Sequence, residues 1–162
     1  MAPLSVGEEV VSSTRIRRAL RAGELEVVSE LLGRPYALAG VVVRGRQLGR
    51  QLGFPTANLD VTGLLLPPTG VYAARVRWRA SEYPCVLNIG MRPTVETAAP
   101  SVHFEVHLLD FEGDLYGEEL EIEFVRQLRP EKKFPGLEPL RRQIAMDVAA
   151  ARAMPGLHIA HG

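Results

Sequence analysis

A glycine-rich segment is the part of the sequence best suited to bind an anion. Glycines and arginines alternate in it after a β-branched run: Gly45, Arg46, Gly49, Arg50 and Gly53. Glycine lets phosphates approach backbone N–H groups closely, and arginine donates charge-assisted hydrogen bonds to phosphate oxygens. The segment is neither a Walker A loop nor a Gly-x-Gly-x-x-Gly motif. Its spacing indicates either a phosphate-binding loop or a flexible hairpin loop with solvated arginines.

Two neutral oxygen ligands follow the glycines directly, at Thr56 and Asn58. On an extended chain these side chains point the same way, ~6–7 Å apart. A hydroxyl and an amide oxygen suit Mg²⁺ that keeps several waters and bridges nucleotide phosphates. The alternative is that both side chains only cap a turn.

The alternating run from His103 to Leu108 offers a third set of chemical groups. On a strand, His103, Glu105 and His107 share one face. The two histidines would be ~13 Å apart, too far to bind one metal ion directly. Glu105 is therefore a candidate general base. A solvated polar face is the other interpretation of the same pattern.

The composition limits the class of protein. The chain has 162 residues, 46% of them hydrophobic, and a formal net charge of zero, which favours one soluble domain and gives no sign of a nucleic-acid or membrane partner. Cys85 is the only cysteine, so an intrachain disulfide and a Cys-x-x-Cys pair are excluded. No apolar stretch approaches the ~18 residues of a membrane span. We expect a cytoplasmic protein.

Short strands between helical ends are the elements that must position these groups. Apolar spacing predicts two short helices, which begin at a hydroxyl cap at 12–14 and end at Gly23 and Gly33. Residues 36–128 contain five or six short strands separated by turns, which favours a closed antiparallel barrel without exposed edges. A last helix presents an apolar face made of Leu137, Leu140, Ile144, Val148 and Ala151.

Several longer strings resemble the riboflavin kinase family. They are Gly49-Arg50-Gln51-Leu52-Gly53-Phe54-Pro55-Thr56-Ala57-Asn58, Asn88-Ile89-Gly90-Met91-Arg92-Pro93-Thr94, Phe104-Glu105-Val106-His107-Leu108-Leu109-Asp110-Phe111, Asp114-Leu115-Tyr116-Gly117-Glu118 and Leu128-Arg129-Pro130-Glu131-Lys132-Lys133-Phe134. The resemblance covers roughly residues 33–153. The chain departs from it after Thr94, where Val95 to Pro100 replace a Phe-Gly-Gly-like turn.

The resemblance implies a mainly β protein, a six-stranded antiparallel Greek-key barrel with a C-terminal helix and a short N-terminal helical segment. It implies transfer of the γ-phosphate of ATP to the 5′-hydroxyl of riboflavin, which gives FMN and ADP. Glu105 would be the catalytic base, and Thr56 and Asn58 would hold Mg²⁺ or another divalent metal. The residues implied at the ATP phosphates are Gly45, Gly49, Arg50, Gly53, Thr56 and Asn58, and those implied at the flavin are Arg129, Phe134 and Leu137.

The N-terminal residues resemble the end of another domain. Ser12 to Arg17 are similar to the last motif of the adenylyltransferase half of bacterial bifunctional FAD synthetases. This implies a division into residues 1–33 (the end of that domain and linker helices), 34–154 (kinase barrel and helix) and 155–162 (tail). We therefore expect an adenylyltransferase domain in a longer natural chain, and no FAD synthesis by this chain alone. A barrel that only binds FMN or FAD is the alternative function.

Overall fold

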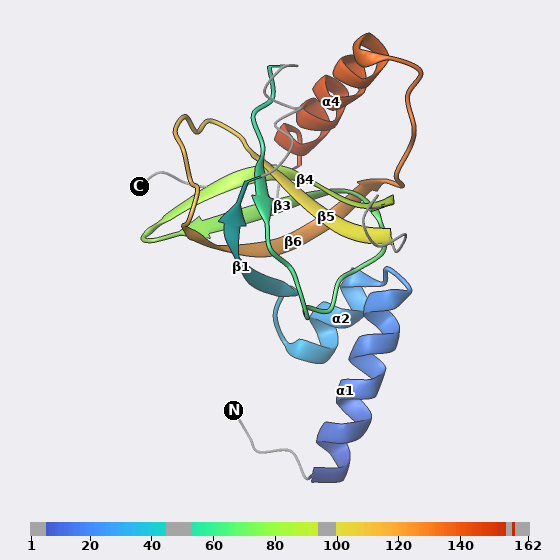
Figure 1. The fold of residues 1–162 in the computed structure, drawn as a ribbon. Coiled ribbons are helices and arrows are strands. Elements are labelled where there is room, and N and C mark those ends of the chain that lie inside the picture. Colours follow the sequence, from blue (N-terminus) through green and yellow to red (C-terminus); the bar gives the residue numbers. More distant parts are fainter. Residues whose placement is uncertain (1–5, 45–52, 94–99, 155–156, 158–162) are drawn as a thin grey trace.

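The computed structural model describes residues 6–44, 53–93, 100–154 and Leu157. In chain order its elements are α1 (Val6–Arg21), α2 (Leu25–Leu32), β1 (Ala37–Val43), β2 (Ala57–Leu59), β3 (Gly70–Trp78), β4 (Ser81–Pro93), β5 (Pro100–Leu108), β6 (Glu119–Arg129) and α4 (Leu137–Arg152). The strands surround a common core, and in the view of Figure 1 α4 lies above the strands while α1 and α2 lie below them.

The six strands close into one antiparallel barrel in the order β1-β2-β5-β4-β3-β6. Strands β3, β4 and β5 form a meander, and β6 returns to pair with β3, which is a Greek-key arrangement. Each described strand pairs with a neighbour on both sides, although the short β2 contributes only two residue pairs to β1 and two to β5. The predicted fold class is therefore confirmed.

Alternation along the strands fills the barrel with apolar side chains. The inward-facing residues include Leu59, Leu87, Phe104, Val106 and Phe124, all buried in one cluster. Tyr72 is also buried there, and its hydroxyl donates to the Pro68 carbonyl oxygen at 2.7 Å. Burial raises the pKa of Tyr72 to about 12. Because successive strand residues face opposite sides, the residues between the core positions lie on the outer surface of the barrel.

The two N-terminal helices end where glycine was predicted to end them. Gly23 has φ 79° and Gly33 has φ 75°, in the left-handed region that glycine enters without strain. The predicted start was wrong, because α1 begins at Val6 and runs through the expected hydroxyl cap at 12–14. No proline interrupts this stretch, and serine and threonine are tolerated inside helices at small cost.

Helix α4 covers part of the outer surface of the barrel. Its residues Val148 and Ala151 pack with Val71, Ala73 and Val86 of strands β3 and β4. Leu137 was predicted to belong to the same apolar face, but this first helical residue is 56% exposed. The helix therefore contacts the barrel through its C-terminal half, and its first turn is left open to solvent.

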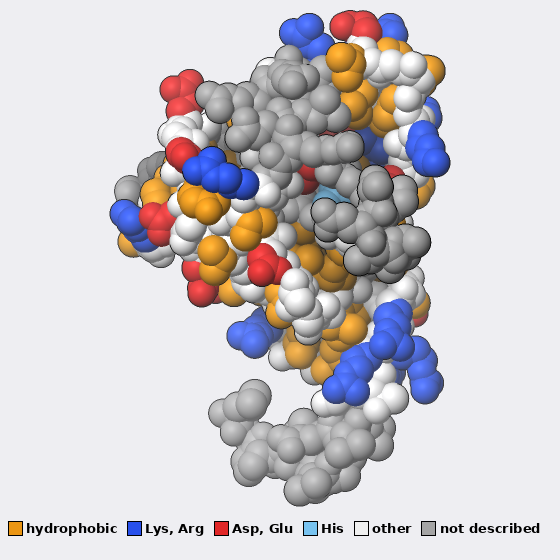
Figure 2. All heavy atoms as spheres, viewed as in Figure 1, with side chains coloured by type: hydrophobic (Ala, Val, Ile, Leu, Met, Phe, Trp, Pro, Cys, Tyr) orange, Lys and Arg blue, Asp and Glu red, His pale blue; other side chains and the backbone are white. Residues whose placement is uncertain are grey.

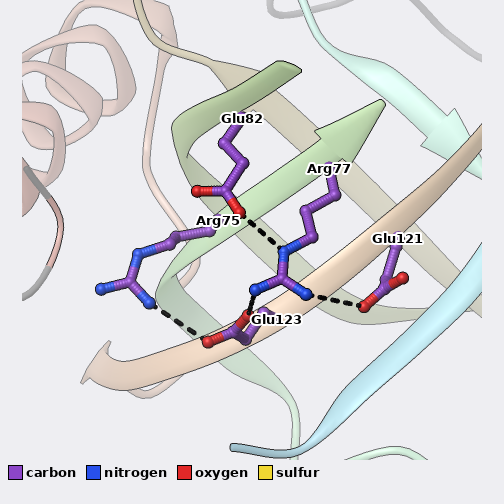
Figure 3. Close-up of polar contacts among 5 residues, drawn as sticks. All are labelled: Arg75, Arg77, Glu82, Glu121 and Glu123. Carbon is purple, nitrogen blue, oxygen red and sulfur yellow. Dashed lines mark hydrogen bonds and ion pairs between the residues drawn. The ribbon is translucent and has the colours of Figure 1, made fainter. Parts of the chain in front are cut away.

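A network of charged side chains crosses the outer surface of β3 and β6 (Figure 3). Arg75 and Arg77 contact one carboxylate oxygen each of Glu123, at 3.1 and 3.0 Å, and Arg77 also contacts Glu82 and Glu121. The Glu123 side chain is 9% exposed, so these two arginines satisfy a nearly buried acid. In the strand order, β3 and β6 lie opposite β2 and β5. The network therefore belongs to the side of the barrel away from Asn58 and Glu105.

Three further features of the molecule lie apart from the candidate site. Exposed basic side chains gather over α1 (Figure 2), where the exposed arginines are Arg15, Arg17, Arg18 and Arg21. Cys85 is buried inside the barrel, and this burial raises the pKa of its thiol. Within the described ranges, no helix has the length and apolar character needed to cross a membrane.

Candidate active site

Strand pairing brings Asn58 and Glu105 together on the outer surface of the barrel. Asn58 of β2 is the direct antiparallel partner of Glu105 of β5, and Glu105 is in turn the partner of Asn88 on β4. Directly opposed residues place their side chains on the same face, with Cβ atoms ~4.5–5.5 Å apart. The neighbouring residues Leu59, Leu87 and Val106 face the core. A half-buried carboxylate therefore lies between two amides.

A pocket of about 480 Å³ opens beside this row of side chains. Thr56 and Asn58 both line it, so the two predicted oxygen ligands face one space. The pocket is also lined by residues 111–116, which connect β5 to β6. Val43, the last residue of β1, and Arg44, which follows it, line the pocket as well. The Arg44 guanidinium lies over the Tyr116 ring, 4.3 Å from its centroid. The pocket thus combines neutral oxygens, a cation, an aromatic ring and the carboxylates of Glu112 and Asp114.

His107 joins β5 to the segment that carries Thr56. Its Nδ1 atom lies 2.7 Å from the Pro55 carbonyl oxygen, and its ring meets the Phe54 ring edge-on at 5.6 Å. His107 also lines the pocket. The sequence placed His107 on the face of Glu105, which the strand alternation supports, but it gave no sign of a partner 52 positions away.

Only part of the predicted phosphate-binding segment belongs to the described structure. Gly45, Gly49 and Arg50 lie outside the described residues. Gly53 is described, is exposed, and has φ 86°, a conformation that side chains other than glycine rarely adopt. The loop after Thr94, where the sequence departs from the family's pattern, also lies outside the described ranges.

The three residues predicted at the flavin lie at the junction of β6 and α4. Val71 of β3 is the strand partner of both Asn88 and Arg129, so Arg129 lies three strands from Glu105, ~14 Å when measured around the curved barrel surface. The Arg129 guanidinium carbon is 5.6 Å from the centroid of the Phe134 ring. Leu137 follows at the start of α4. The structure therefore brings Arg129 and Phe134 into contact and leaves Leu137 exposed nearby.

Asp147 is a buried acid that the sequence did not single out. It is 5% exposed, and its two oxygens accept hydrogen bonds from Nε and Nη2 of Arg129 at 3.0 and 2.9 Å. Gln143 donates a further hydrogen bond to Asp147 at 3.0 Å. This bidentate pair connects α4 to the end of β6. The available signal was an acid inside the apolar stripe of the helix, between Ile144 and Ala151.

Gly90 is a second residue whose role emerges only in three dimensions. It is the strand partner of His103, and a Cβ atom at Gly90 would overlap the His103 ring and lie 2.5 Å from a Glu131 oxygen. The missing side chain lets the 130–134 segment come close to β4 and β5. Across the described part of the chain, no three His, Cys, Asp or Glu residues are grouped to hold a metal ion.

Comparison with known proteins gives a consistent family. Residues 32–155 match the family model described as Flavokinase, riboflavin kinase. A bifunctional riboflavin kinase/FMN adenylyltransferase from Pseudomonas fluorescens is 48% identical over 150 residues, which are 91% of this chain and 48% of that protein. The chain thus spans about half the length of the curated relatives it matches.

Solved structures agree on the fold. A crystal structure of a protein named as a macrolide-efflux protein, from Streptococcus pneumoniae, superimposes with a TM-score of 0.81 at 33% identity, over 88% of this chain and 46% of that one. The riboflavin kinase from Trypanosoma brucei superimposes with a TM-score of 0.53 at 27% identity, over 76% of this chain and 83% of that one. With its family match over most of its length, the chain belongs to the riboflavin kinase family.

Proposed function

We propose that the chain transfers the γ-phosphate of ATP to the 5′-hydroxyl of riboflavin and releases FMN and ADP. The observation that carries this proposal is the register that sets Asn58 beside Glu105, at the rim of a pocket that Thr56 also lines. Phosphoryl transfer depends mainly on positioning and on electrostatic stabilisation. A carboxylate next to neutral oxygen ligands is an arrangement that can do both.

Thr56 and Asn58 fit a divalent metal bound together with nucleotide phosphates. Their oxygens are hard, neutral donors, and Mg²⁺ prefers oxygen ligands while keeping part of its water shell. When bound, Mg²⁺ would offset the negative charge of the phosphates. We assign the 480 Å³ pocket to the nucleotide, with the stacked Arg44 and Tyr116 in its wall. Gly45, Gly49, Arg50 and Gly53 would complete the phosphate site.

Glu105 would act on the flavin alcohol. Placed within hydrogen-bond reach, its carboxylate orients the hydroxyl and accepts the proton as the new O–P bond forms. Asn88 would assist on the other side, since its buried side-chain oxygen accepts no hydrogen bond from the described residues. Phe134 and Leu137, with Arg129 behind Phe134, would border the flavin ring.

The wider setting of the chain is also part of the proposal. The names of these relatives combine the kinase with an FMN adenylyltransferase, so we propose that such a domain accompanies this one in a longer natural chain. A buried lone cysteine is compatible with a reducing compartment, and we propose the cytoplasm.

The 162-residue polypeptide is expected to convert riboflavin to FMN when ATP and a divalent metal are supplied. It should not convert FMN to FAD, because the family match of this polypeptide is to the riboflavin kinase. Chromatographic separation of the flavins after incubation measures both outcomes. Binding of flavin without any FMN formation would instead favour a non-catalytic flavin-binding module, and accumulation of FAD would contradict the assignment of this polypeptide to the kinase step alone.

The Asn58→Ala variant is expected to lose kinase activity by about tenfold or more and to require more ATP or Mg²⁺. The lost amide oxygen removes a metal or phosphate contact worth on the order of 1–3 kcal/mol, while the barrel core is unchanged. Initial rates across a titration of ATP and Mg²⁺ test this. Thr62→Ala is the matched control, because Thr62 caps a turn by donating to Asp60 at 2.6 Å. Equal kinetics for both variants would mean that Asn58 makes no contact that the kinase reaction needs.

A further inference from the structure

The segment in front of β2 needs a fixing contact that the strand ladder does not give. Strand β2 has three residues, and its pairing with β5 consists of Ala57 with Val106 and Asn58 with Glu105. Thr56 lies just outside this ladder. Pro55 has no N–H group and cannot continue the ladder as a donor. The backbone that orients Thr56 is therefore held by something other than regular strand pairing.

His107 supplies that contact from the neighbouring strand. Its Nδ1 atom is 2.7 Å from the Pro55 oxygen, which is the only backbone polar group that proline has. A carbonyl oxygen only accepts, so Nδ1 carries a proton and donates. The edge-on contact with Phe54, at 5.6 Å, holds the ring in place on the other side. The His107 side chain thus adds one hydrogen-bonded connection between β5 and the segment that carries Thr56.

Glu105 and His107 are two residues apart on one strand, so their side chains share the outer face of β5. Glu105 is fixed against Asn58 by the ladder, and the peptide before Thr56 is fixed by His107. Both sides of the reaction centre are therefore set from a single rigid strand. A shift of about 1 Å in such an arrangement is enough to lower a rate severalfold to a hundredfold.

We propose that His107 is a positioning residue that holds Thr56 in the orientation required to bind metal-bound ATP. This inference rests on the proposed function, because it assigns Thr56 to the metal and phosphates. His107 acts through the Pro55 carbonyl group and takes no part in the proton transfer assigned to Glu105.

Two variants separate the hydrogen bond from the ring contact. His107→Phe keeps an aromatic ring for Phe54 and loses the donor, whereas His107→Asn keeps an N–H donor close to the position of Nδ1 and loses the ring. Steady-state kinetics with ATP and riboflavin varied in turn, Mg·ATP binding by calorimetry and thermal unfolding are measured for both variants and for wild type.

For His107→Phe we expect KM for Mg·ATP and its Kd to rise about tenfold, the size of effect expected when a displaced Thr56 loses one hydrogen-bond-strength contact with the ligand. KM for riboflavin should stay within about twofold, and the melting temperature should stay within a few degrees of wild type. His107→Asn should recover most of the ATP affinity.

Three results would overturn the role of His107. They are an unchanged KM for Mg·ATP in His107→Phe, equal increases in both KM values together with a large loss of thermal stability, or no recovery in His107→Asn despite normal stability. A wild-type chain that forms no FMN would instead contradict the proposed function itself. The failure of the inference and the failure of the function are thus separated by the wild-type assay.

Discussion

Replacing Glu105 with glutamine is expected to lower kcat by about 100-fold or more, which corresponds to ~3 kcal/mol of activation free energy. A primary alcohol is a poor nucleophile at neutral pH, and a positioned base typically contributes ~10²–10⁴-fold in rate. Glutamine keeps the size of the side chain and can still accept a hydrogen bond from the alcohol, but it cannot take the proton. Rates at saturating ATP and riboflavin measure the effect, and riboflavin binding followed by flavin fluorescence should change much less.

Glu119→Gln is the matched control for this experiment. Glu119 is an exposed strand glutamate on β6, and its strand partner is Val41, whereas Glu105 lies between the two amides Asn58 and Asn88. Its substitution removes the same charge from the barrel surface and should leave kcat near the wild-type value. If Glu105→Gln retains kcat within about threefold of wild type, the proton is taken by another group or needs no base, and the assignment of Glu105 is wrong.

The strands and the closed barrel could be predicted because their signals are local. The alternation in residues 103–108 and 120–125 gives the inward and outward faces directly, and turn residues separate the strands. The helix stops at Gly23 and Gly33 follow from the conformational freedom of glycine. Thr56 and Asn58 could also be predicted to face the same space, because residues two positions apart on an extended segment point the same way.

The site itself could not be assembled from these local signals. The register that places Asn58 opposite Glu105 is decided between strands, and a shift of one residue would turn either side chain toward the core. The contact between His107 and Pro55 depends on the same register. Leu137 matched the helical apolar spacing but lies beyond the part of α4 that reaches the barrel, so spacing alone gave the wrong burial.

The buried pair of Arg129 and Asp147 is expected to contribute strongly to the stability of the fold. Replacing Asp147 with alanine is expected to lower the free energy of unfolding by ~3 kcal/mol, because the guanidinium of Arg129, 18% exposed, would remain mostly buried without its acid. Alanine is a better helix former than aspartate, so intrinsic helix propensity acts in the opposite direction. A measured loss can therefore be assigned to the broken pair. Urea denaturation followed by circular dichroism gives the value.

Arg152 offers a matched control on the same helix. Its guanidinium makes two hydrogen bonds of 3.0 Å with Asp110, but the two side chains are 49% and 65% exposed. Solvent screens such a pair, so Arg152→Ala should cost ~1 kcal/mol or less.

The double variant Arg129→Met with Asp147→Leu should recover much of the lost stability, since apolar pairs can replace a buried ion pair. It should also lower riboflavin affinity if Arg129 holds Phe134 beside the flavin. Equal costs for Asp147→Ala and Arg152→Ala would show that α4 is anchored by its apolar contacts with β3 and β4 instead.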